Sequence, residues 1–147
     1  MFWFSDWMYG VPVLVGTIVL HVSGLILAGW VLAIMDGRRK PPRTIVYFIA
    51  AVSTLALIAV TLHGVEAHIW AVLYLWLGAL PNYHAALLYS FDAVTSYGHA
   101  PILLRDGWQL LGAIEAMNGL ILFGLTTAFL LGAIARLRPV HNLLKEQ

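Results

Sequence analysis

The sequence predicts an all-α integral membrane protein with three transmembrane helices and one short helix that dips into the membrane and returns. Apolar residues make up 61% of the 147 residues, charged residues only 10%, and the mean hydropathy is +0.86. Soluble domains are nearer half apolar and a quarter charged, so this composition is typical of membrane proteins. Long apolar runs fill nearly the whole chain, which leaves no room for a separate soluble domain.

The first span is predicted from about Val11 to Met35, which is long enough to cross a hydrocarbon core of roughly 30 Å. A loop with the strongest basic cluster of the chain follows it, formed by Arg38, Arg39, Lys40 and Arg43. The positive-inside rule places that loop in the cytoplasm and the N-terminus outside. Residues 1–43 are therefore predicted to be an N-terminal helix with a basic cytoplasmic loop.

The second apolar pattern covers residues 44–80 and is too long for one perpendicular span. Because His63, Glu66 and His68 lie in its far half, we expect the helix to leave the membrane near Thr61. The remainder would project outward or lie along the interface.

A short helix is predicted over residues 82–94, with Asn82 as its N-cap. The last helix pattern covers residues 107–137, and a tail of residues 138–147 follows it. Basic residues near this end place it in the cytoplasm as well: Arg136, Arg138 and Lys145. We expect a multi-pass protein of the cell (inner) membrane with a cytoplasmic C-terminus.

Several function classes are disfavoured by composition and motifs. The chain has no cysteine, which excludes thiol chemistry and a disulfide framework. Its formal net charge of +1 gives no sign of nucleic-acid binding. No nucleophile–base pair and no phosphate-binding loop is visible, so we expect that the protein is not an enzyme and has no cofactor. We expect membrane lipids as its surroundings.

The order of a short helix, a polar turn and a long helix is typical of a pore loop. Non-helical backbone is tolerated at membrane depth only where protein buries it or where it lines a watery cavity. Ion-selectivity filters meet that condition by turning carbonyl oxygens toward the ions. The C-terminal end of the short helix carries a partial negative charge that favours cations.

The region from Leu80 to Leu137 resembles the tetrameric potassium-channel superfamily, in particular its small bacterial two-helix pore modules. The most specific piece is "WQLLGAIEAMNGLILFGLTTAFLLG", in which Gly119 stands four residues before Phe123 and "FGLTTAFL" follows. The resemblance implies that residues 44–147 are a pore module and that the first helix is an addition.

The resemblance also implies a selectivity filter over residues 94–99, comprising Val94, Thr95, Ser96, Tyr97, Gly98 and His99. The family pattern is Thr-Val-Gly-Tyr-Gly-Asp, so Val94 replaces the threonine of the innermost ion site. Ser96 replaces a glycine, which is unfavourable if that position needs a positive φ. His99 replaces the aspartate at the outer mouth of the pore.

The resemblance implies a homotetramer, because four chains each supply one filter loop. It would conduct monovalent cations, K⁺ or Na⁺, passively. In the last helix Glu115, Asn118, Leu122 and Thr126 share one face, which we predict to line the pore or pack behind the filter, with Gly119 as the flexible point. The alternative for Glu115 is a neutral side chain hydrogen-bonded to a neighbouring helix.

Three readings compete with the channel. His63, Glu66 and His68 suggest a metal site, but His68 lies five residues from His63 and points away on a helix, so we expect a polar collar at the outer surface. His21 stands alone in the first span and is expected to be a hydrogen-bonded packing residue.

A metalloenzyme would need His63 and His68 to converge with His84 or His99. A non-conducting, channel-like subunit is the third reading.

Overall fold

The computed structural model describes residues 3–39, 44–98 and 101–137, and all four of their regular elements are α-helices. They are α1 (Trp3–Arg39), α2 (Ile45–Trp76), α3 (Tyr83–Thr95) and α4 (Gln109–Leu137). The helices α1, α2 and α4 are long and apolar enough to cross a membrane. The predicted class, a helical membrane protein with three spans, is therefore confirmed at this level.

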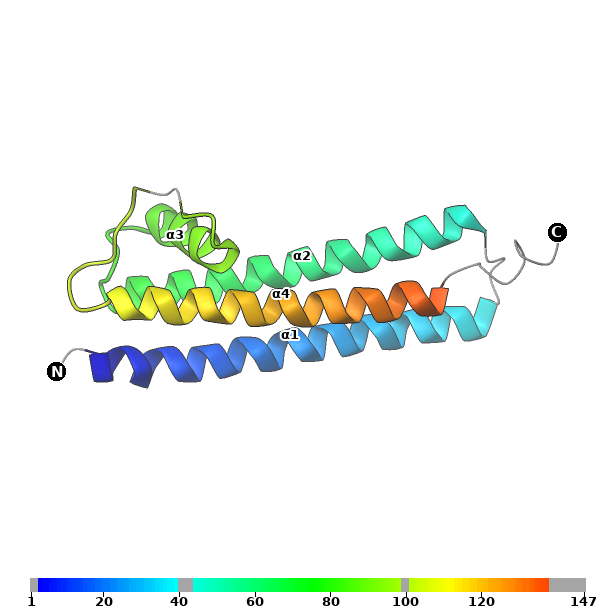
Figure 1. The fold of residues 1–147 in the computed structure, drawn as a ribbon, viewed down its shortest axis with the longest axis horizontal. Helices are drawn as coiled ribbons and strands as arrows, with labels where there is room; N and C mark the ends of the chain where they lie inside the picture. Colours follow the sequence, from blue (N-terminus) through cyan, green and yellow to red (C-terminus); the bar gives the residue numbers. More distant parts are fainter. Residues whose placement is uncertain (1–2, 40–43, 99–100, 138–147) are drawn as a thin grey trace.

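The three long helices run side by side, with α2 antiparallel to α1 and α4 (Figure 1). This arrangement brings the C-terminal ends of α1 and α4 together at one end of the bundle, as the charge pattern predicts. At the other end α2 finishes and α4 begins, so the whole connection between them leaves and returns on the same side (Figure 1). The helix α3 lies within that connection.

The helix α3 has 13 residues and is about 20 Å long, which is too short to span a membrane. Its predicted N-cap is confirmed, because the Asn82 side chain accepts a hydrogen bond from the Ala85 backbone N–H at 2.9 Å. The loop after α3 is tied back to the end of α2 by a hydrogen bond from the Arg105 N–H to the Ala79 carbonyl, 3.2 Å long.

The main apolar core lies at the α3 end, where four helices meet. Its buried members come from α2, α3, α4 and the loops between them: Trp70, Ala71, Tyr74, Ala79, Leu80, Ala86, Leu104, Leu111 and Ile114. The C-terminal half of α2 supplies the largest of these side chains. The alternative of a separate helix along the interface is contradicted, because α2 continues unbroken to Trp76 and packs in the bundle. A membrane exit near Thr61 stays a prediction.

Candidate functional site

The predicted filter residues lie at the end of α3 and in the turn after it. Val94 and Thr95 belong to the helix itself, and the Thr95 hydroxyl donates to the Phe91 carbonyl at 2.6 Å. This differs from the expected loop, because the helix continues to Thr95. His99 lies outside the described residues.

Ser96, in the turn after α3, adopts the positive φ that is unfavourable for a residue with a Cβ atom. Ser96 has φ 55° and ψ 30°, the left-handed conformation, and is the only described non-glycine residue with a positive φ. Gly98 also has a positive φ, of 68°. Residues 95–98 are exposed in the single chain.

The turn is placed deep along α4 by a close contact with Gly119. A Cβ atom on Gly119 would collide with the backbone carbonyl of Val94 and would lie 2.7 Å from its Cα atom. Only glycine fits there without moving a helix. The helices α3 and α4 thus approach closely at Gly119 and also at Gly112, where a Cβ atom would collide with the Tyr89 side chain. Gly124 and Gly132 have nothing within 4 Å.

The predicted pore-lining face of α4 is turned into the bundle of its own chain. All five of its residues are buried, and Thr126 is the most exposed of them at 8%: Glu115, Asn118, Gly119, Leu122 and Thr126. Glu115 accepts a hydrogen bond from the Tyr74 hydroxyl of α2, and Asn118 donates to the Thr17 hydroxyl of α1 at 2.7 Å. Of the two alternatives predicted for this face, pore lining is therefore contradicted, and packing behind residues 94–98 agrees with the contact of Gly119 with Val94. The hydrogen bond from a neighbouring helix, expected as the alternative for Glu115, is confirmed.

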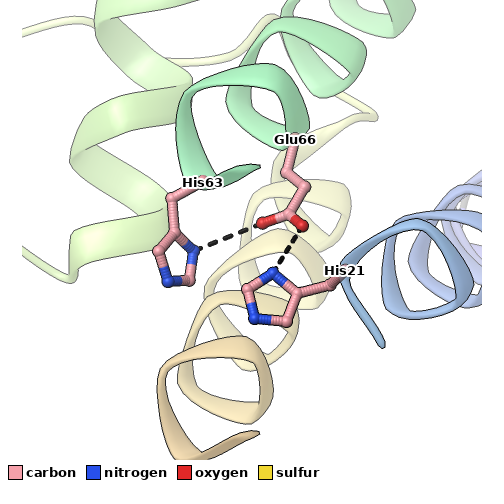
Figure 2. Close-up of side chains that lie close together, drawn as sticks. All are labelled: His21, His63 and Glu66. Atoms are coloured by element: carbon pink, nitrogen blue, oxygen red, sulfur yellow. Dashed lines mark hydrogen bonds and ion pairs between the residues drawn. The ribbon is translucent and has the colours of Figure 1, made fainter. Parts of the chain in front are cut away.

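A second polar cluster lies between α1, α2 and α4, and Figure 2 shows its three ionisable members. His21 Nδ1 is 2.7 Å from Oε1 of Glu66, and His63 Nδ1 is 3.2 Å from Oε2 of the same carboxylate. On their far sides both rings reach the Thr126 hydroxyl, His21 Nε2 at 2.9 Å and His63 Nε2 at 3.2 Å. His21 and Glu66 are fully buried, and His63 is 7% exposed.

His68 takes no part in this cluster. It is exposed, and its Nδ1 lies 2.9 Å from the Tyr83 hydroxyl at the start of α3. His84 is exposed as well. The convergence of His63 with His68 and His84, which a metalloenzyme would require, is not found, and the expected collar at the outer surface is wrong for His63 and Glu66 because both are buried between helices.

His21 is the member that sequence reasoning missed as a partner of His63 and Glu66. A signal for it exists in the chain. His21 lies 18 residues before the end of α1 at Arg39, and His63 lies 18 residues after the start of α2 at Ile45. In two antiparallel helices joined by a short loop, residues equally far from the loop lie at the same depth.

The comparisons with known proteins add no family or fold. No protein-family model, no curated protein and no solved structure matches the chain.

Proposed function

We propose that the chain is one subunit of a potassium-channel-like homotetramer that conducts monovalent cations passively across a membrane. The observation that carries the proposal is the contact of Val94, the residue before the polar turn at residues 95–98, with Gly119 near the middle of α4. The other supports are the exposed face of α4 and the direction in which α3 ends. The inner membrane and a cytoplasmic location for the C-terminal end of α4 belong to the same proposal.

The position of Val94 along α4 supports a turn inside the apolar layer of the membrane. Val94 contacts Gly119, which stands four residues, about 6 Å, before Phe123 at the middle of the 29-residue helix α4. A hydrocarbon core of roughly 30 Å centred on that helix includes this level. An exposed non-helical segment at this level requires protein or water around it, because lipid offers polar groups no hydrogen bonds. Further subunits and a water-filled pore would supply the surroundings that the single chain lacks.

The end of α3 suits a cation at this position. Its C-terminal carbonyl groups carry a partial negative charge, and they end at Ser96, next to the exposed turn. The left-handed Ser96 ends the helix, and Gly98 also has a positive φ, so the chain leaves the axis of α3 at this turn. In a tetramer four such ends would surround one axis.

The corrected rotation of α4 selects a different face for the pore. Helices α1, α2 and α3 cover the side with Glu115 and Asn118, and the opposite side is left exposed. Along it lie Leu120, which is 63% exposed, the small residues Gly124, Thr127 and Ala128, and Leu131, which is 62% exposed. We assign the pore-lining role to this exposed face.

Flux and mass together test the function. The purified chain in liposomes is expected to carry K⁺ or Na⁺ down a gradient, and native mass spectrometry is expected to give a tetramer. A species no larger than a dimer would remove the pore proposal. A tetramer without cation flux would leave the non-conducting subunit as the better description.

Because the chain has no cysteine, single cysteines can test the rotation of α4 cleanly. Leu120→Cys is expected to give a channel that a charged thiol reagent blocks at least ten-fold. Leu122→Cys is the matched control, since Leu122 is fully buried inside the chain and its thiol should stay unmodified. Block at Leu122 but not at Leu120 would restore the original pore-lining face.

A Gly119→Ala substitution tests whether the contact with Val94 positions the turn. The added Cβ must push α3 away from α4, so we expect flux to fall at least ten-fold while the tetramer persists. Gly16→Ala is the control, because nothing lies within 4 Å of a Cβ at that position. Equal flux in both variants would show that the position of α3 does not matter for conduction.

A further inference from the structure

The cluster of His21, His63 and Glu66 has the composition of a metal site. One ligand atom from each of the three side chains lies within 4.8 Å of the others, and all three residues are buried. Two imidazoles and one carboxylate are ligands typical of Zn²⁺ and related transition-metal ions. Calcium and magnesium instead prefer six or more oxygen ligands.

With two neutral imidazoles and an ionised carboxylate, the cluster has three hydrogens for the four contacts that join its side chains. A neutral imidazole carries one N–H and one lone pair, and a carboxylate can only accept. The Thr126 hydroxyl has one hydrogen, so it can donate to only one of the two Nε2 atoms that it faces. One of the four contacts therefore joins two atoms with no hydrogen between them, and a cation bound there, a proton or a metal ion, would remove this mismatch.

The geometry shows where this mismatch falls. His63 Nδ1 and Glu66 Oε2 face each other at 3.2 Å, yet neither atom has a hydrogen bond within the described chain. Two ligand atoms on a tetrahedral Zn²⁺ ion are about 3.3 Å apart, because each lies about 2.0–2.2 Å from the metal. The separation of His63 Nδ1 from Glu66 Oε2 is close to this value. His21 Nδ1 faces the other oxygen, Oε1, at 2.7 Å, so its ring or the carboxylate must shift before one ion can bind both rings and a single oxygen.

We propose that His21 Nδ1, His63 Nδ1 and the Glu66 carboxylate bind one divalent transition-metal ion, of which Zn²⁺ is the type, with a fourth position open to water. In that form both Nδ1 lone pairs point at the metal, as the ring orientations in Figure 2 allow. Both Nε2 atoms then carry hydrogens, and the two lone pairs of the Thr126 hydroxyl accept them.

The surroundings hold these ligands in place and suggest what the ion does. The His63 ring is stacked on Phe123 of α4, with ring centres 4.2 Å apart. The ligands come from α1 and α2, and Thr126 comes from α4. The ion therefore fastens the N-terminal helix to the other two long helices. This proposal concerns binding within one chain and does not depend on conduction.

Metal titration of the purified full-length chain in detergent, stripped with a chelator, tests the site. Co²⁺ is expected to bind at one ion per chain, with the visible absorption of a four-coordinate ion, and Zn²⁺ is expected to displace it. His21→Gln and His63→Gln should each weaken Co²⁺ binding at least ten-fold. The matched control is His68→Gln, an exposed histidine on the same helix as His63, which should bind as tightly as the unmodified chain.

Two results of the titration would overturn the site. One is the absence of stoichiometric Co²⁺ and Zn²⁺ binding by the unmodified chain. The other is an equal loss of binding in His68→Gln. Electron paramagnetic resonance of bound Cu²⁺ requires no substitution, so it decides the matter even if a variant fails to fold. Coupling to two imidazole nitrogens is expected, and coupling to fewer than two would refute the assignment.

Discussion

Two glutamates, Glu66 on α2 and Glu115 on α4, are both fully buried between the long helices, but their neighbours differ in kind. Glu66 faces two imidazole nitrogens, from His21 and His63. Glu115 faces the hydroxyl of Tyr74, which donates a hydrogen bond to it. An imidazole offers a lone pair that can share a cation with the carboxylate, whereas a phenol hydroxyl offers a hydrogen.

This difference separates a ligand from a structural acceptor. Burial alone does not distinguish the two carboxylates, because an ionisable group inside a span is expensive at either position. The chemistry of the side chains that face each carboxylate distinguishes them. We therefore assign cation binding to the cluster around Glu66 and helix–helix attachment to the pair formed by Tyr74 and Glu115.

The largest loss in the free energy of unfolding is expected when Glu66 is replaced. Glu66→Leu leaves two buried imidazoles without the carboxylate that they face, and at about 1–3 kcal/mol for each unsatisfied buried group the loss should be about 3 kcal/mol. Glu115→Leu leaves one hydroxyl without an acceptor and should cost about 1–2 kcal/mol. Unfolding in mixed micelles with increasing SDS measures both free energies. A larger loss for Glu115→Leu would reverse the assignment.

A smaller effect is expected for Tyr74→Phe, which removes only the hydroxyl. The free energy of unfolding should fall by about 1.5 kcal/mol, since the buried carboxylate of Glu115 loses its donor. In the Glu115→Leu background the same change should be nearly neutral, because both polar partners are then gone. Equal losses in the two backgrounds would show that the hydrogen bond contributes nothing to stability.

The smallest effect separates two adjacent threonines of α4. Thr126→Val keeps the shape but removes the hydroxyl shared by two imidazoles, so we expect a loss of about 1 kcal/mol and a metal affinity lowered about ten-fold. Thr127 bonds only to the Phe123 carbonyl in its own helix, at 2.8 Å, and Thr127→Val should stay within about 0.5 kcal/mol. Equal metal affinities in the two variants would remove Thr126 from the site.

The sequence by itself determines the elements of this protein. The apolar runs predict the three long helices, and Asn82 predicts the start of α3, because length, hydropathy and capping are local properties. The spacing of three residues also places His63 and Glu66 on one face of a helix and turns His68 away.

Only the tertiary structure decides which faces meet. It rotates α4 so that Glu115 and Asn118 point into the chain, and it brings His21 to a pair of residues more than 40 positions away. The physical reason lies in the spans themselves. A helix that is apolar all round has no contrast between a polar and an apolar side to orient it, so its rotation is set by packing against its neighbours.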